Sequence, residues 1–176
     1  MTTLAESPVY TPFRVAVDQR EQLPYSFTGL LADASQSHRP LVVVCENHHL
    51  ETGDYSIVGM SDLVAIERKS LADLYTTLGQ GRDRFEAEHQ RLAGMSFAAV
   101  VIEATLEDTI RRPPDRSKLN PKTVYRTALS WPVRYGVHWI FCGSRRLAEV
   151  TTFRLLQQFH TQWTTPRNLE EKTHES

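Results

Sequence analysis

The stretch at residues 64–70 constrains the fold more than any other part of the chain. Three apolar residues come first, and Glu67, Arg68 and Lys69 follow directly. Charged groups at the end of so apolar a segment are typical of a buried strand that ends at a polar site. Apolar residues then recur at helical spacing at positions 71, 74, 75 and 78. The chain therefore passes from a buried strand straight into an amphipathic helix.

The rest of the sequence alternates strand-like and helical segments. We expect strands at residues 13–18, 41–45, 55–58, 63–67, 97–103 and 137–142, with 41–45 buried on both faces and 55–67 forming a hairpin. We expect helices at residues 71–78, 82–93, 122–135 and 144 to about 163, and a turn of helix with an irregular loop over 105–121. This order predicts an α/β fold with a mixed central sheet flanked by helices. Pattern alone also permits a flavodoxin-like fold.

The length of 176 residues suits a single domain, 1–176, with its core at about 13–163 and flexible termini at 1–12 and 166–176. No secretory signal and no apolar run of membrane-spanning length is present in the sequence. We therefore expect no membrane partner and a cytoplasmic protein, nucleoid-associated or, in a eukaryote, nuclear. Cys45 and Cys142 lie in apolar runs without metal-ligand spacing, which predicts buried free thiols.

Strand geometry predicts a shared site for three of the charged residues. Side chains alternate along a strand, so Glu67 and Lys69 project to one side and Arg68 to the other. Asp54 opens the first strand of the hairpin, which would bring it beside Glu67. Mg²⁺ takes one or two carboxylates and keeps waters and phosphate oxygens, so this pattern predicts metal-assisted phosphodiester hydrolysis. The alternatives are a turn residue at position 54 and a surface ion pair between Glu67 and Lys69.

These segments resemble the XPF-type structure-selective nucleases (the ERCC-four family), a branch of the PD-(D/E)xK restriction-endonuclease-like enzymes. The matching pieces occur in the family's order at residues 17–21, 53–55, 66–69 with Asp73, 81–82 and 98–103. The resemblance implies a restriction-endonuclease-like core and a DNA endonuclease that uses Mg²⁺ or Mn²⁺. It also implies DNA as partner, including branched DNA in repair or recombination, and a homodimer or a separate targeting protein. The apolar stripe of the last helix and Trp139 are the candidate dimer surface.

The resemblance also implies roles for individual residues. Metal-binding carboxylates are expected at Asp18, Asp54 and Glu67, with Lys69 at the attacking water; Asp18 is either a direct ligand or one step removed from the ion. Supporting roles fall to Arg20, Glu21, Arg68 and Asp73. Arg68 points away from Glu67 and is expected first to orient or pair within the core. Ser70 and Asp73 also have the spacing of a capping box, so Asp73 has a structural alternative.

The charge distribution predicts where nucleic acid would bind. Residues 105–146 contain nine basic and three acidic residues, whereas acidic residues outnumber basic ones at positions 14–104. An acidic half that collects metal and a basic half that meets phosphate suit a nuclease, and a solvated basic loop is the alternative. The candidate nucleic-acid-binding residues are Arg82, Arg111, Arg112, Arg116, Lys118 and Lys122. The rival function is a non-catalytic DNA-binding or assembly module with the same fold, which the retained acids disfavour.

Overall fold

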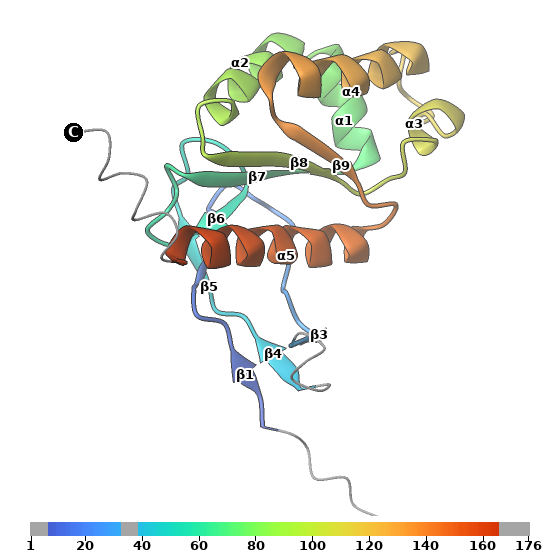
Figure 1. Ribbon diagram of the computed structural model, residues 1–176. Helices are drawn as coiled ribbons and strands as arrows, with labels where there is room; N and C mark the ends of the chain where they lie inside the picture. Colours follow the sequence, from blue (N-terminus) through green and yellow to red (C-terminus); the bar gives the residue numbers. More distant parts are fainter. Residues whose placement is uncertain (1–6, 33–38, 166–176) are drawn as a thin grey trace, which may run out of the picture.

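A six-stranded mixed sheet forms the centre of the protein in the computed structural model, which describes residues 7–32 and 39–165 (Figure 1). The strand order is β5-β2-β6-β7-β8-β9. The strands are β5 (Cys45–His48), β2 (Val15–Asp18), β6 (Tyr55–Ile57), β7 (Val64–Lys69), β8 (Phe97–Ile102) and β9 (His138–Phe141). β7, β8 and β9 run parallel, whereas β6 is antiparallel to both β2 and β7. The predicted hairpin is therefore confirmed.

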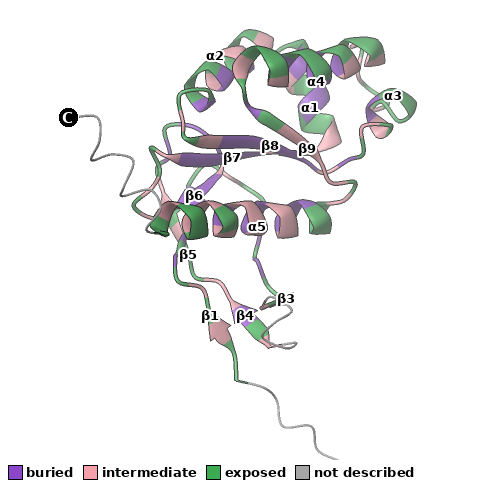
Figure 2. Cartoon of the chain, in the orientation of Figure 1, coloured by how far each residue is buried: buried purple, intermediate pink, exposed green. Residues whose placement is uncertain are grey.

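Helices cover both faces of this sheet, as the alternating pattern predicted. One face carries α5 (Arg145–Thr164), and the other carries α1 (Leu71–Gly79), α2 (Arg82–Leu92) and α4 (Pro121–Tyr135) (Figure 1). The short α3 (Asp108–Arg111) lies in the loop that follows β8. Figure 2 shows β7 and β8 as buried, and each face of the sheet has its own apolar core. Two covered faces explain why the central strands read as unbroken apolar runs.

The expected second strand at residues 41–45 is wrong. Two short strands occupy this region: β4 (Pro40–Val42) belongs to a separate small sheet with β1 (Val9–Tyr10) and β3 (Leu30–Leu31), and β5 starts at Cys45. Val44, between them, is exposed, because the chain crosses there from the small sheet to the edge of the main one. The apolar run thus reflects two edges and a crossing rather than one central strand. β1 also gives order to residues 9–10 of the expected flexible terminus; residues 1–6 and 166–176 lie outside the described part.

Two further expectations change. Cys45 and Cys142 are free thiols, but neither is buried as predicted: Cys45 is exposed because β5 is an edge strand, and Cys142 is half-buried. The apolar stripe of α5 packs within the chain, where Ala148, Phe153 and Leu156 join the core below the sheet. The Trp139 indole donates to His89 Nε2 at 2.9 Å. These two features therefore give no support to the predicted homodimer. No helix in the described ranges is long and apolar enough to cross a membrane.

Candidate active site

Asp54 is placed by a tight backbone turn at Gly53. Gly53 has φ +78°, and a Cβ there would lie 3.0 Å from the Ala65 side chain and 3.3 Å from the Ile66 carbonyl oxygen. Only glycine fits both the positive φ and this close approach without strain. The Asp54 N–H donates to Ile66 O at 2.9 Å, and Asp54 Oδ2 accepts from the Arg68 N–H at 2.7 Å. The Asp54 carboxylate is thereby held against the end of β7.

Glu67 and Lys69 leave β7 on the side of α1 and α2, as strand alternation predicted. Glu67 is buried, and its carboxylate forms an ion pair with the Lys69 ammonium. The same ammonium lies 4.9 Å from the centre of the Phe85 ring of α2. One apolar wall and one carboxylate therefore hold Lys69 in place beside the site.

Electrostatics at this strand end favour the arrival of a cation. Burial, and then the charge of Glu67, raise the pKa of Asp54 well above its usual value. Burial would lower the pKa of Lys69, but Glu67 and then Asp54 raise it overall. Lys69 thus supplies one positive charge beside two carboxylates, the half-buried Asp54 and the buried Glu67. A second positive charge would be stabilised in this arrangement.

A cavity of about 300 Å³ opens at these side chains. Asp54, Glu67 and Lys69 line it together with Arg68 of β7 and with residues from the loop after β2 and the first turn of α1: Arg20, Glu21, Gln22, Leu23 and Asp73. Seven of the eight residues predicted for the catalytic and supporting roles therefore meet in one place. The predicted convergence of Asp54, Glu67 and Lys69 is observed.

Asp18 is the residue that lies apart. Its Oδ1 accepts from the Arg20 N–H at 2.8 Å and from Arg20 Nε at 2.7 Å, and its Oδ2 accepts from the Leu50 N–H at 2.8 Å. These bonds outweigh the effect of burial and lower the pKa of Asp18. The Asp18 side chain is 2 % exposed and the Arg20 side chain 61 %. Asp18 thus binds both the backbone N–H and the guanidinium of Arg20, and Arg20 in turn lines the cavity.

Arg68 leaves β7 toward the α5 face, where it sits in an ion network. Its Nε donates to Glu103 Oε1 at 2.7 Å, its Nη2 to Glu103 Oε2 at 3.2 Å, and its Nη1 to Glu21 Oε1 at 3.3 Å. Tyr25 Oη and Arg145 Nη1 also donate to Glu103 Oε1, at 2.9 and 3.2 Å. This geometry is the orienting and pairing role expected of Arg68. It ties Glu21, and with it the loop after β2, to the strand end.

The N-cap half of the expected capping box forms at the start of α1, and the Asp73 carboxylate accepts from the Ser70 hydroxyl. Ser70 is the N-cap, its Oγ accepts from the Asp73 N–H at 3.1 Å, and it donates to Asp73 Oδ2 at 2.6 Å. Asp73 also lines the cavity. Both roles weighed for Asp73 are therefore compatible with its position.

Glu88 of α2 is a site residue that the sequence reasoning missed. Its carboxyl group contacts Glu67 and accepts from the Gly53 N–H, and burial followed by the charge of Glu67 raises its pKa to about 7. The signal was present in the helical pattern. Phe85, Glu88 and Leu92 fall at i, i+3 and i+7, so one acid lies on the apolar stripe of an otherwise amphipathic helix.

The basic candidates divide into three groups. Arg82 faces α4, where its Nη1 donates to Thr127 Oγ1 at 3.2 Å and its guanidinium lies 5.1 Å from the Trp131 ring, so it is directed away from the cavity. Arg111 and Arg112 form exposed ion pairs with Glu107 and Asp108 at 2.8 and 3.4 Å. The three remaining residues have no ion pair among the described residues: Arg116, Lys118 and Lys122.

The carboxylates present fit a divalent metal of the magnesium type. In the parts of the chain that are described, no three His, Cys, Asp or Glu side chains converge on one point. The expected trio therefore does not form, because Asp18 is occupied elsewhere. Asp54 and Glu67 remain, and Mg²⁺ is held in enzymes by one or two carboxylates with waters and substrate oxygens completing its shell.

Comparison with known proteins bears on this geometry. The ERCC4 domain family model matches residues 17–153, a span that contains every residue of the cavity. The chain belongs to the ERCC4 domain family. No curated protein matches the sequence.

Two solved structures share the fold of this chain. XPF from Aeropyrum pernix is similar with a TM-score of 0.59 and 19% identity, over 90% of this chain and 69% of that one. XPF from Aeropyrum pernix in complex with DNA gives a TM-score of 0.55 and 21% identity, over 85% of this chain and 66% of that one. The chain thus spans about two thirds of either XPF chain. At this identity the likeness concerns the fold, and it confirms the predicted α/β architecture of the XPF type.

Proposed function

We propose that the protein is a divalent-metal-dependent DNA endonuclease that hydrolyses phosphodiester bonds, with branched or flap DNA as its substrate. The observation that carries the proposal is the cavity in which Asp54, Glu67 and Lys69 meet. Membership of the ERCC4 domain family supports it, as does the complex of the similar XPF structure with DNA.

In this proposal Asp54 and Glu67 hold Mg²⁺ or Mn²⁺. The bound ion would offset the negative charge that builds on the scissile phosphate and lower the pKa of a water. In this proposal the Lys69 ammonium donates a hydrogen bond to the attacking water or to a phosphate oxygen and so orients it. The Phe85 ring behind Lys69 keeps that ammonium at the cavity.

Arg20 supplies a phosphate contact at the cavity mouth. Its guanidinium is fixed by Asp18 and by a bond from Nη2 to Leu50 O at 2.7 Å, yet it remains largely exposed. A guanidinium held in one orientation loses little side-chain entropy when it binds a phosphate. Asp18 would therefore affect DNA binding through Arg20, and so is a positioning residue.

Cleavage of labelled DNA tests the proposal. Forks, flaps and linear duplexes are incubated with Mg²⁺ or Mn²⁺ and the wild-type protein, Asp54→Asn, Glu67→Ala or Asp62→Ala. Asp62 is an exposed acid in the turn between β6 and β7, so it is the matched control. We expect cleavage by the wild-type protein and by Asp62→Ala, and none by the other two. If none of the four proteins, the wild type included, cleaves any of the DNA substrates, the proposal is contradicted and the non-catalytic module remains.

A further inference from the structure

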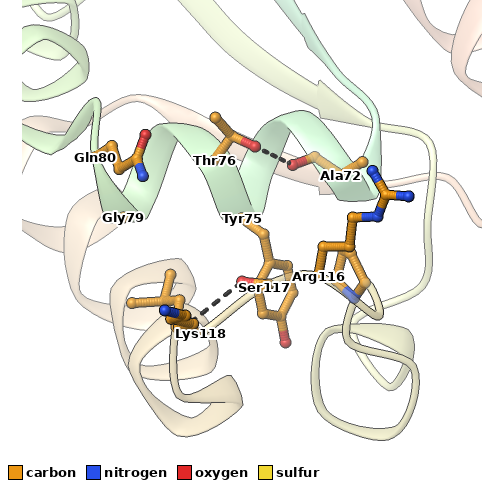
Figure 3. A pocket seen from close by; sticks show the side chains of 10 residues that line it. Ala72, Tyr75, Thr76, Gly79, Gln80, Arg116, Ser117 and Lys118 are labelled. Carbon is orange, nitrogen blue, oxygen red and sulfur yellow. Dashed lines mark hydrogen bonds between the residues drawn. The ribbon is translucent and has the colours of Figure 1, made fainter.

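A second and larger hollow lies next to the candidate active site, between α1 and the segment that follows α3. Its volume is about 660 Å³. On one side it is lined by residues of α1 and its C-cap, and on the facing segment by Arg116 and Lys118 among others (Figure 3). The α1 side consists of Ala72, Tyr75, Thr76, Gly79 and the C-cap Gln80. We call this hollow the α1 groove.

The α1 groove and the cavity both reach the first turn of α1. Ala72 lines the groove, and its neighbour Asp73 lines the cavity. From there the groove follows α1 to Gly79 and Gln80. The nine residues of α1 span about 13 Å at a rise of 1.5 Å per residue. A stacked nucleic-acid strand advances about 3.4 Å per nucleotide, so this length accommodates three to four nucleotides.

The charge of the groove suits a phosphate backbone. None of the described residues that line it is acidic, and Arg116 and Lys118 have no ion pair in the described ranges. In Figure 3 Arg116 lies at the Ala72 end and Lys118 on the side of Gly79, so the two positive charges are spaced along the groove. The other basic residues of this region differ, because Arg111 and Arg112 already pair with acids of α3.

We infer that the α1 groove binds the single-stranded arm of the DNA substrate as that strand leaves the metal site. This inference rests on the proposed nuclease function and names the part of the substrate that the groove takes. Arg116 and Lys118 contact phosphates toward the two ends of the bound segment, and the helix surface between Ala72 and Gly79 forms the floor.

Gly79 offers a test that leaves the fold intact. A Cβ at Gly79 would meet no atom within 4 Å, so larger side chains fit there and project into the groove. Gly79→Glu and Gly79→Lys add side chains of comparable size and opposite charge. Both are made in a Glu67→Gln background, so that cleavage does not consume the probe. Fluorescence anisotropy then measures the affinity for a labelled duplex that carries a single-stranded arm of one or of six nucleotides.

We expect the parent to bind the six-nucleotide arm about five- to tenfold more tightly than the one-nucleotide arm. Gly79→Glu should abolish this preference, and Gly79→Lys should keep or increase it. Arg116→Ala with Lys118→Ala should reduce the slope of log K against log salt by about 1.4, since two phosphate contacts on a single strand are lost. The control is Arg91→Ala with Arg126→Ala, which removes two exposed charges outside the groove and should leave the slope unchanged.

Two outcomes would overturn the inference: an arm preference that survives in Gly79→Glu, or equal slopes for the two double variants. The cleavage assay keeps this result separate from the proposed function. Cleavage without any effect at Gly79 would remove the groove assignment alone. The opposite result is also informative. If Gly79→Glu abolishes the arm preference but the protein with intact Glu67 cleaves no DNA, the proposed nuclease activity is wrong and the groove remains a strand-binding site.

Discussion

Both faces of β7 carry an ion pair near the end of the strand, but the two pairs lie in different surroundings. On the α5 face, Arg68 is surrounded by Glu103, Glu21 and Tyr25, and its hydrogen-bonding groups have partners. On the α1 face, Glu67 and Asp54 share a single ammonium beside an open cavity. The first arrangement stabilises a strand end, whereas the second leaves negative charge for a ligand. Adjacent residues of one strand thus belong to two arrangements, a paired ion network and a candidate reaction site, and the network borders the site because Arg68 and Glu21 also line the cavity.

The largest effect should come from the α1 face of β7, which we call the open face because the cavity lies there. Glu67→Ala removes one of two carboxylates proposed to hold the metal, and a bound metal contributes several kcal/mol to the stabilisation of charge on a reacting phosphate. We expect the rate of Mg²⁺-dependent cleavage to fall about a thousandfold or more. Glu67→Ala relieves the like charge beside Asp54 but also removes the ion-pair partner of Lys69, so the free energy of unfolding is measured alongside to separate loss of cleavage from loss of fold. Cleavage within tenfold of wild type in Glu67→Ala would show that this face is not the reaction site.

On the α5 face, which we call the closed face, substitutions should change the free energy of unfolding. Arg68→Met leaves Glu103 half-buried with only part of its network, and breaking such a pair costs about 3–5 kcal/mol when it is buried. We expect urea denaturation to show a loss of this order at neutral pH. The matched variant Arg68→Met with Glu103→Gln removes both charges and should recover most of the loss. If Arg68→Met unfolds at the wild-type urea concentration, the network does not stabilise the strand end.

A third prediction concerns His89, which lies behind the open face. It is fully buried, its Nε2 accepts from Trp139, and burial lowers its pKa to about 4. Its unfolded pKa is about 6.5, so the unfolded state binds the extra proton first as the pH falls. Stability should therefore be complete above pH 6.5 and decrease toward pH 4, by about 2 kcal/mol at pH 5 from this group.

Denaturation of wild type and His89→Gln at pH 7.5 and pH 5 measures this term. The wild-type protein should lose about 2 kcal/mol more than the variant over that interval. An equal loss in both proteins would mean that His89 is not held neutral in the fold.

The smallest effect separates the two roles of Asp73. Ser70→Ala removes the N-cap of α1 and should lower the free energy of unfolding by about 1 kcal/mol. If Asp73 serves only as the capping partner, Asp73→Ala should match Ser70→Ala in both stability and cleavage rate. A much slower cleavage in Asp73→Ala at similar stability would instead assign the carboxylate to the cavity.

The sequence predicted most of the open face because its residues lie close together along two paired strands. The hairpin follows from Gly53, Asp54 and the apolar run before Glu67, and alternation then sets the faces. Asp18 could not be placed in this way, since its hydrogen bonds depend on how the backbone at Leu50 approaches it. Glu103 and Tyr25 lie 78 positions apart, so their contact in the closed network required the fold.

Edges of the molecule were predicted less well than its centre. Residues 40–48 are apolar at first and then polar, and periodicity does not reveal that two different sheets divide them. Glu88 was also missed, although an acid on the apolar stripe of α2 was visible in the sequence. For residues 40–48 the deciding information is the element packed alongside, which local pattern does not contain; for Glu88 the pattern shows the acid but not that it lies beside Glu67.

Direct measurement of metal binding tests the central claim most sharply. Isothermal titration with Mn²⁺ is performed on wild type, Asp54→Asn, Glu67→Gln and the Asp62→Ala control, without DNA. We predict binding to one site in wild type and in Asp62→Ala, and affinity at least tenfold weaker in the other two. Equal Mn²⁺ affinity in all four proteins, or no binding to the wild type, would contradict a metal site at the end of β7.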